Sequence, residues 1–194
     1  MCLRNKPKYN QIIEAALQVI AENGYHASQV AKIAKQAEVA DGTIYLYFKN
    51  KEDILISVFK EKMGSFIEGI KKEIDKQESA SDKLLTLIEM HYKQLTKSPY
   101  LAIVTQLELR QSKPALRKEI NKVLKSYLDV IDSIIELGVK SGEITPKLNP
   151  RLMRQMIFGT LDESVTNWVM KSQRFDLAEQ TEEIHQLLTR GLFQ

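Results

Sequence analysis

The sequence contains a single cysteine, Cys2, so it can form neither an intramolecular disulfide nor a metal site built from several cysteines. It has no apolar run approaching the roughly 18 residues that cross a bilayer, and its first residues form no apolar signal core. The net charge is only +3, which is too small to indicate nucleic-acid binding by itself. We therefore expect a cytoplasmic globular protein that makes no contact with a membrane.

The sequence also lacks the patterns that many enzymes carry. Its three histidines, His26, His91 and His185, are far apart and show no metal-ligand spacing. It has no Gly-x-Ser-x-Gly elbow, no phosphate-binding glycine loop and no pairing of cysteine with histidine. Asp162 and Glu163 are adjacent, so on a helix they diverge by about 100° and cannot converge as a carboxylate pair. We expect no catalytic residues, no metal and no cofactor.

Helical periods separated by capping residues fill the sequence, and no segment alternates with a period of two. A first helix is predicted over 7–23, and Asn50 is expected to cap a long helix over 51–74. Residues 75–83 contain no large apolar side chain, which predicts a loop and a domain boundary. The predicted fold is all-α, with about nine helices arranged as an N-terminal three-helix head and a C-terminal helical body.

Two short helices near the front of the chain are separated only by Glu38-Val39-Ala40. This spacing fits a helix-turn-helix, whose second helix enters the major groove of DNA. In the second helix, over 41–47, Ile44 and Phe48 can face inward because they are four residues apart. The side chains left to project elsewhere are those of Gly42, Thr43, Tyr45 and Tyr47. The spacing alone also allows a tight helical hairpin with ordinary surface tyrosines.

Two further features flank this segment. Ser28 is expected to cap the first of the two short helices. A short basic arm precedes the first helix and could lie along phosphates; it consists of Arg4, Lys6 and Lys8.

This part of the chain resembles the DNA-binding head of the TetR family. The matching residues are Gly24-Tyr25, Ser28-Gln29-Val30, Ile33-Ala34, Val39, Gly42 through Phe48 and Lys51 through Leu55. The resemblance implies a homodimeric repressor that a small ligand releases from double-stranded operator DNA. It implies DNA contacts at Ser28, Gln29, Gly42, Thr43, Tyr45, Tyr47 and Lys51.

The chain departs from the family pattern at two positions. Glu38 stands where the family commonly has glycine in the turn, and Ala40 stands where it commonly has a serine cap. Asp41 could then take over the cap and shift the start of the helix by one residue.

Most of the chain is also similar to the FadR-type fatty-acid degradation repressors of Gram-positive bacteria. The similarity lies in the segments 37–53, 102–112 and 154–160. It implies that long-chain acyl-CoA is the effector and that the repressed genes are those of β-oxidation.

An acyl-CoA site needs an apolar pocket and basic side chains for the CoA phosphates. The apolar stripes of the body suggest a pocket near His91, Val104, Leu107, Tyr127 and Met156. Basic residues gather where one helix ends and the next begins, and we expect Arg110, Lys113 and Arg117 to lie at the pocket mouth. These stripes can equally be plain core, the cations can be merely solvated, and His91 can be a hydrogen-bonded core histidine.

Two other functions remain open. The body could sense a cationic xenobiotic, in which case Glu108, Asp162 and Glu163 would face the pocket. The chain could also be a helical interaction or lipid-carrier module that never binds DNA.

The last two helices are expected to form the homodimer interface, because both carry apolar faces and Gly159 allows a close helix approach. A two-fold dimer would read a palindromic operator. The expected division is a helix-turn-helix domain over 1–50, a connecting helix over 51–74, and an effector-binding and dimerisation domain over 75–194. Effector binding would then favour a different separation of the two heads.

Overall fold

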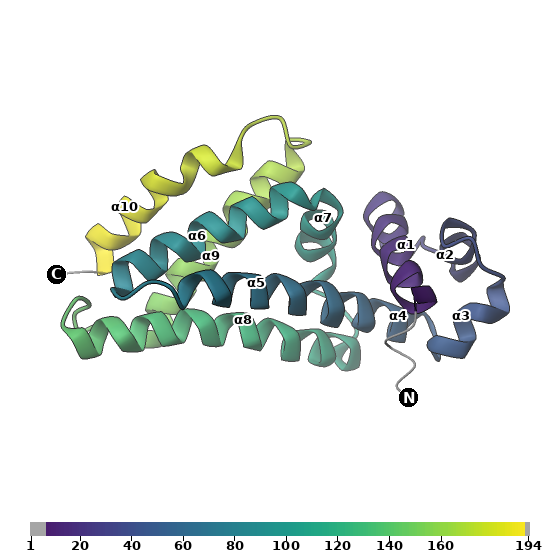
Figure 1. Ribbon diagram of the computed structural model, residues 1–194, viewed down its shortest axis with the longest axis horizontal. Helices are drawn as coiled ribbons and strands as arrows, with labels where there is room; N and C mark the ends of the chain where they lie inside the picture. The colour runs from purple at the N-terminus through teal and green to yellow at the C-terminus, as the bar shows by residue number, and fades with distance from the viewer. Residues whose placement is uncertain (1–6, 193–194) are drawn as a thin grey trace. The chain divides into compact units, whose positions relative to one another are not determined.

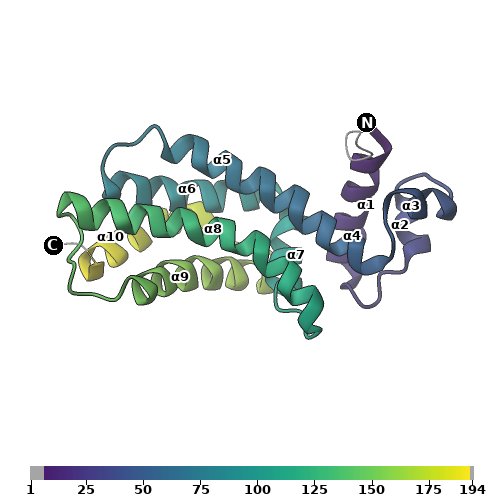
Figure 2. The ribbon, with the colours of Figure 1, turned by 90° about the horizontal axis from the view of Figure 1, so that it is seen from below.

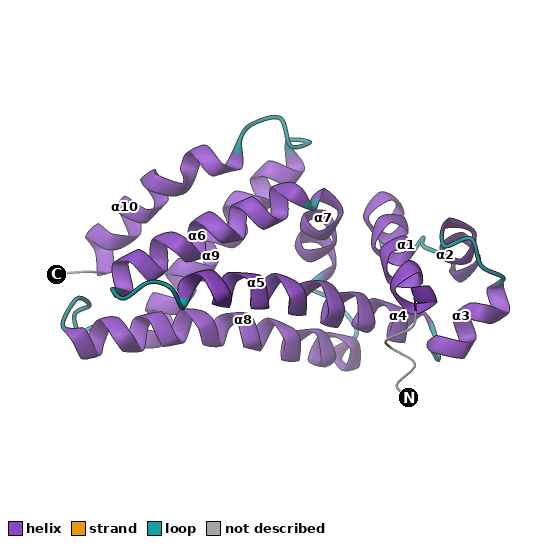
Figure 3. Ribbon diagram, in the orientation of Figure 1, coloured by secondary structure: helices purple, strands orange, loops and turns teal. Residues whose placement is uncertain are grey.

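In a computed structural model, which describes residues 7–192, the chain consists of helices joined by loops, and this range contains no strand (Figure 3). The helices, labelled in Figure 1, are α1 (Pro7–Asn23), α2 (Val30–Gln36), α3 (Asp41–Tyr47), α4 (Lys51–Val58), η2 (Phe59–Met63), α5 (Gly64–Ile74), α6 (Ala80–Lys97), α7 (Pro99–Glu108), α8 (Pro114–Ser141), α9 (Pro150–Met170), η3 (Leu177–Gln180) and α10 (Thr181–Leu192). The predicted all-α class is confirmed. Cys2 and two residues of the predicted basic arm, Arg4 and Lys6, lie outside the described residues.

Side-chain caps explain several of the helix starts. The Asn50 side chain accepts a hydrogen bond from the Asp53 amide at the start of α4, and the Asn149 side chain accepts one from the Arg151 amide in α9. The predicted loop over 75–83 is too long, because Ser79 caps α6 and the helix begins at Ala80. The prediction relied on the absence of large apolar side chains, but a capping serine can start a helix whose first residues are small or polar.

Two of the predicted caps are wrong. The residue before α2 is Gln29 rather than Ser28, and the residue before α3 is Ala40 rather than Asp41; neither gives a side-chain cap. Glu38 has a positive φ of 51°. The turn therefore does require the left-handed backbone that a glycine would adopt without strain, and Glu38 adopts it at a cost of roughly 1–2 kcal/mol.

The described residues group into two compact units. The first contains the residues up to Gly64 together with Pro99–Val123, and the second contains Ser65–Ser98 together with the residues from Leu124 onward. The predicted division at residues 50 and 74 stays a prediction.

In the first unit, α1 lies at the centre and packs against α2, α4 and α7. Its predicted stripe, Ile12, Ala16, Val19 and Ile20, is buried. This apolar packing holds the two short helices, which are too short to be stable alone.

In the second unit, α10 lies along α6 and contacts α9. Figure 2 shows α5, α8 and α9 running alongside one another. The Tyr127 ring of α8 lies 5.9 Å from the Phe66 ring of α5 and 6.1 Å from the Phe158 ring of α9, measured between centroids. The core of this unit therefore contains a group of aromatic rings.

The long helix predicted after Asn50 is not uniform, because η2 is a π-helical segment between α4 and α5. Leu55, Phe59 and Met63 are all buried although they are spaced four residues apart. That spacing drifts by about 40° per step around an α-helix, and a wider turn corrects the drift. None of the described helices is long and apolar enough to cross a membrane.

Candidate DNA-binding and effector sites

The second short helix, α3, exposes one face and buries the other. Ile44 and Phe48 are 0% and 2% exposed, whereas Tyr45 and Leu46 are 58% and 70% exposed. The Phe48 ring stacks on the Tyr9 ring of α1 with centroids 5.3 Å apart. The inward pair thus fixes which side chains α3 presents to a partner.

Most of the predicted DNA contacts lie on accessible parts of the first unit. Gln29 and Gly42 are exposed, and Thr43 and Tyr47 are half-buried. Ser28 is fully buried, and its hydroxyl donates hydrogen bonds to the carbonyl oxygens of Val19 and Gly24. These residues remain predicted contacts, and Ser28 also fixes the end of α1.

Sequence reasoning missed Leu46, the most exposed large apolar residue of α3. An apolar side chain on a recognition helix can contact the methyl group of thymine. Its position between Tyr45 and Tyr47, which were predicted to face outward, could have indicated that it is exposed. A leucine in a short helix is, however, usually predicted to be buried.

Lys51 is tied to the turn between α1 and α2. Its ammonium lies 4.6 Å from the centre of the Tyr25 ring and donates a hydrogen bond of 2.8 Å to the His26 carbonyl. Burial lowers the pKa of Lys51, and the nearby Glu108 carboxylate opposes that shift. Burial raises the pKa of Tyr25, as do Glu52 and Glu108.

Two predicted effector residues, His91 and Tyr127, meet in the second unit. The Tyr127 hydroxyl and His91 Nδ1 are 2.8 Å apart and hydrogen-bonded, and both side chains are buried. The Phe66 ring lies edge-on to the His91 ring at 5.4 Å. Within the described residues, His91 Nε2 has no hydrogen-bond partner. The aromatic core therefore contains a polar atom whose bonding capacity is unused.

Burial controls the protonation of this cluster. It lowers the pKa of His91 to about 3, so the imidazole is neutral at physiological pH. It raises the pKa of Tyr92 to about 12, which the neighbouring Ser164 hydroxyl offsets in part. The pKa of Tyr127 lies well above its ordinary value because of burial, with further contributions from Tyr92 and Asp162. Neutral groups in an apolar core suit an uncharged part of a ligand.

The remaining predicted effector residues are spread over both units. Met156 is 44% exposed on α9 of the second unit. In the first unit, Val104 is buried and Leu107 is 48% exposed on α7. The exposed side chains of Met156 and Leu107 are therefore not part of either core, and all three stay predicted pocket residues.

The predicted basic rim lies at the corner between α7 and α8. Arg110, Lys113 and Arg117 are all exposed. Lys113 pairs with Glu52 of α4 at 2.5 Å, and an Arg117 nitrogen donates to the Gln111 carbonyl at 3.4 Å. Exposure leaves these cations accessible to an anionic group.

The three carboxylates that would suit a cationic ligand differ in their surroundings. Glu108 is buried in the first unit and accepts hydrogen bonds there. Asp162 is buried in the second unit, whereas Glu163 is exposed and accepts a bond from the Asn167 side chain at 3.0 Å. The divergence of Asp162 and Glu163 follows from their adjacency on α9.

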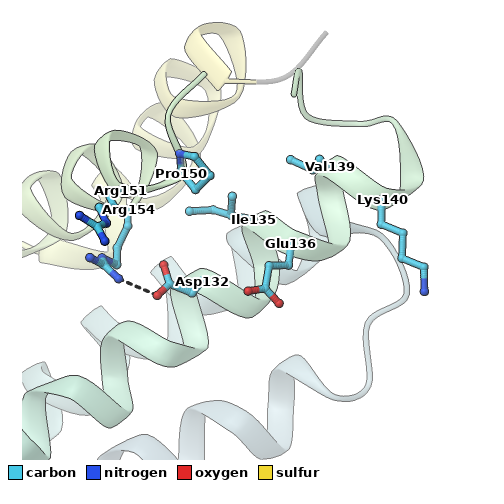
Figure 4. A pocket seen from close by; sticks show the side chains of 8 residues that line it. All are labelled: Asp132, Ile135, Glu136, Val139, Lys140, Pro150, Arg151 and Arg154. Atoms are coloured by element: carbon cyan, nitrogen blue, oxygen red, sulfur yellow. Dashed lines mark hydrogen bonds and ion pairs between the residues drawn. The ribbon is translucent and has the colours of Figure 1, made fainter. Parts of the chain in front are cut away.

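A groove of about 440 Å³ lies in the second unit between the end of α8 and the start of α9 (Figure 4). Arg154 crosses it to pair with Asp132 at 2.6 Å. The lining residues are Asp132, Ile135, Glu136, Val139, Lys140, Pro150, Arg151 and Arg154. None of them was predicted as an effector residue. Among the described residues, no three histidine, cysteine or carboxylate side chains are grouped so as to hold a metal ion.

Comparison with known proteins identifies the class. Residues 12–58 match the bacterial regulatory proteins of the tetR family, and residues 59–191 match the C-terminal region of YsiA-like proteins. The chain therefore belongs to the TetR family of bacterial regulatory proteins.

Particular relatives are similar over nearly the whole chain. The chain is 58% identical over 189 residues to the fatty acid metabolism regulator protein of Bacillus subtilis (strain 168), covering 97% of both proteins. The crystal structure of the transcriptional regulator FadR from B. subtilis in complex with stearoyl-CoA has a TM-score of 0.91 and 59% identity, covering 94% of this chain and 98% of that one. The fatty acid degradation regulator FadR from Bacillus halodurans has a TM-score of 0.91 and 56% identity, covering 95% and 99%. The resemblance predicted from the sequence is confirmed, and these relatives are regulators rather than enzymes.

The substitution Gly42→Ala separates folding from DNA binding. No atom lies within 4 Å of the position that a Cβ would take at Gly42. In a helix, alanine is more stable than glycine by about 0.5–1 kcal/mol, so the free protein should melt at the same or a higher temperature. Because the family resemblance places DNA against this residue, binding to DNA should weaken about tenfold or more.

Gly64→Ala is the matched control for this test, because Gly64 is also helical and also has nothing within 4 Å. It should leave DNA binding unchanged. A Gly42→Ala protein that binds DNA as tightly as the wild type would show that the backbone of α3 does not approach the duplex.

The depressed pKa of His91 predicts a dependence of stability on pH. The unfolded chain takes up a proton at this side chain below about pH 6.5, whereas the folded chain does so only near pH 3. Stability from the neutral imidazole is therefore present above pH 6.5 and is lost as the pH falls. Between pH 7 and pH 5 the wild type should lose about 2 kcal/mol more than His91→Gln, measured by urea unfolding. Equal losses for wild type and His91→Gln would refute the prediction.

Proposed function

We propose that this chain is a DNA-binding repressor of fatty-acid degradation genes that long-chain acyl-CoA releases from its operator. The observation that carries the proposal is the similarity over 94% of the chain to a regulator whose crystal structure contains stearoyl-CoA. A regulator of this kind acts on the chromosome, so we place it in the cytoplasm.

The exposed face of α3 supports the DNA-binding part of the proposal. Thr43 and Tyr45 can reach base edges and phosphates from a helix in the major groove. Lys51 supplies a positive charge that would contact phosphate irrespective of sequence.

The surface of the second unit supports a homodimer formed by α9 and α10. Leu152, Met156 and Gly159 lie on one face of α9 at helical spacing, and the first two are 54% and 44% exposed. No atom lies near the Cβ position of Gly159, and Leu187 of α10 is 64% exposed. Apolar side chains on two neighbouring helices favour a partner helix pair, and a two-fold pairing would match a palindromic operator.

The hydrogen-bonded His91–Tyr127 pair supports an effector site in the second unit. When the Tyr127 hydroxyl donates to Nδ1, the neutral imidazole carries its proton on Nε2, which is the atom without a partner among the described residues. That N–H can donate to a carbonyl oxygen such as that of a thioester. The surrounding aromatic and aliphatic side chains suit an acyl chain. Arg110, Lys113 and Arg117 belong to the first unit, where their exposed cations would suit an anionic group such as a phosphate.

The buried Asp162 carboxylate favours a second candidate, a repressor that binds a lipophilic cation. A carboxylate near aromatic rings is a typical site for such a cation. The two effectors are opposite in charge, so a single titration separates them.

The proposal is tested by isolating an operator and then titrating it. Sedimentation should first give twice the mass of one chain, and selection from random duplexes should yield a palindrome with half-sites about 34 Å apart or a multiple of that. Fluorescence anisotropy then follows DNA release by stearoyl-CoA, free CoA, stearate and tetraphenylphosphonium. Stearoyl-CoA should weaken operator binding roughly 5–150-fold, whereas free CoA should not.

Two controls test whether the DNA binding and its loss are specific. A lysophospholipid with an 18-carbon chain tests for a detergent effect and should leave the complex intact. The double variant Tyr47→Ala, Lys51→Ala should fold but lose DNA binding at low salt. Release by the cation and by no acyl-CoA would contradict the acyl-CoA proposal in favour of the cation sensor, and failure to select any duplex would contradict DNA binding itself.

A further inference from the structure

Glu108, the last residue of α7, is a buried carboxylate in the first unit, with 8% of its surface exposed. A buried carboxylate is tolerated only when it accepts hydrogen bonds. Here the backbone N–H of Tyr25 donates to Oε1 at 2.7 Å, and the Gln111 side chain donates to Oε2 at 2.5 Å. The first of these bonds joins α7 to the turn that follows α1.

The turn held by Glu108 leads into the helix-turn-helix. Gly24 has a φ of +74°, a left-handed conformation that ends α1 and that glycine adopts without strain. The Tyr25 N–H thereby leaves the helical ladder and is taken by Glu108. At the other end of α7, the Tyr100 hydroxyl lies 3.3 Å from Glu22 of α1 and donates to it. α7 is therefore fastened to the end of α1 at two places.

The same turn is fastened to the start of α4. The Lys51 ammonium lies over the Tyr25 ring and donates to the His26 carbonyl, and Lys113 in the α7–α8 loop pairs with Glu52. Tyr25 thus donates a hydrogen bond from its backbone to Glu108 of α7, and its ring lies against the Lys51 ammonium of α4. A displacement of Glu108 would therefore be transmitted to Lys51 through Tyr25 alone.

We propose that Glu108 is a positioning residue for DNA binding: its carboxylate holds the α1–α2 turn, and through Tyr25 the Lys51 ammonium, in the arrangement that binds the operator. The exposed cations predicted to bind the CoA phosphates, Arg110, Lys113 and Arg117, follow it directly along the chain. An effector that moves this corner would therefore loosen Glu108 from the turn. The positioning role rests on the DNA-binding part of the proposed function, and this last step rests also on its acyl-CoA part.

The variants Glu108→Gln and Glu108→Ala test the proposal. Glutamine keeps an acceptor for the Tyr25 N–H, and a rotated Gln111 amide can accept from the new side chain, so the fold is retained while the charge is lost. A hydrogen bond to a neutral acceptor is roughly half as strong as one to a carboxylate. Alanine removes both bonds. The matched control is Glu119→Gln, which neutralises a partly exposed carboxylate of the same unit that pairs with Lys122 on α8.

Operator affinity is measured without effector, at a temperature where circular dichroism shows each variant fully folded. Glu108→Ala should bind about tenfold or more weakly and Glu108→Gln about threefold more weakly, with Glu119→Gln unchanged. Hydrogen exchange at the Tyr25 amide should accelerate in the same order, which gives a readout that needs neither DNA nor a fully stable alanine variant. Wild-type operator affinity in a folded Glu108→Gln protein with accelerated Tyr25 exchange would overturn the proposal.

The second measurement is the factor by which stearoyl-CoA weakens operator binding. This factor should fall at least about threefold in Glu108→Gln, while the affinity of the DNA-free protein for stearoyl-CoA stays the same. A merely structural role would lower stability and leave the factor at its wild-type value, and that result would overturn transmission through Glu108. If stearoyl-CoA fails to release the wild type, the proposed effector is wrong, and the effector-free affinities still decide whether Glu108 positions the DNA-binding turn.

Discussion

The recognition segment is a helix of seven residues, which cannot be stable by itself because nucleation is costly and few hydrogen bonds follow. Its structure depends on the burial of Ile44 and Phe48 against the rest of the first unit. Fully burying such side chains contributes roughly 1.5–3 kcal/mol each, and the stacking of Phe48 on Tyr9 adds specificity of orientation. Because Ile44 and Phe48 occupy the buried side of the helix, Tyr45 and Leu46 lie on its exposed side.

The buried polar groups of the two units differ in charge. In the first unit, the Glu108 carboxylate binds the turn between α1 and α2, so a charge inside the unit acts on backbone that leads to the DNA-binding helices. In the second unit, the His91–Tyr127 pair is neutral and is surrounded by aromatic rings. The Glu108 carboxylate fixes the backbone, which suits a DNA-binding head. The neutral His91–Tyr127 pair has unused hydrogen-bonding capacity, which suits a ligand-binding core.

Local patterns were sufficient to predict most of the fold. Asn50 and Asn149 mark helix starts because a capping side chain needs only the next few residues, and the stripe of α1 is fixed by its helical period. The spacing of Ile44 and Phe48 predicted which side of α3 is buried and which is exposed. The π segment was not predictable in this way, because it depends on how the long helix packs.

Long-range contacts explain what the sequence could not indicate. The sequence suggests Glu108 as a pocket carboxylate for a cation. Its hydrogen-bond partner Tyr25 lies 83 residues earlier in the sequence, and no local pattern relates the two residues. Ser28 is predicted to be a helix cap, yet its hydroxyl donates to the carbonyl oxygens of Val19 and Gly24.

If DNA and acyl-CoA bind opposing states of one protein, each must weaken the other by the same factor. Isothermal titration of stearoyl-CoA into the protein, with and without saturating operator, should therefore give dissociation constants that differ by the factor measured for DNA release, roughly 5–150-fold; equal dissociation constants with and without operator would contradict the account.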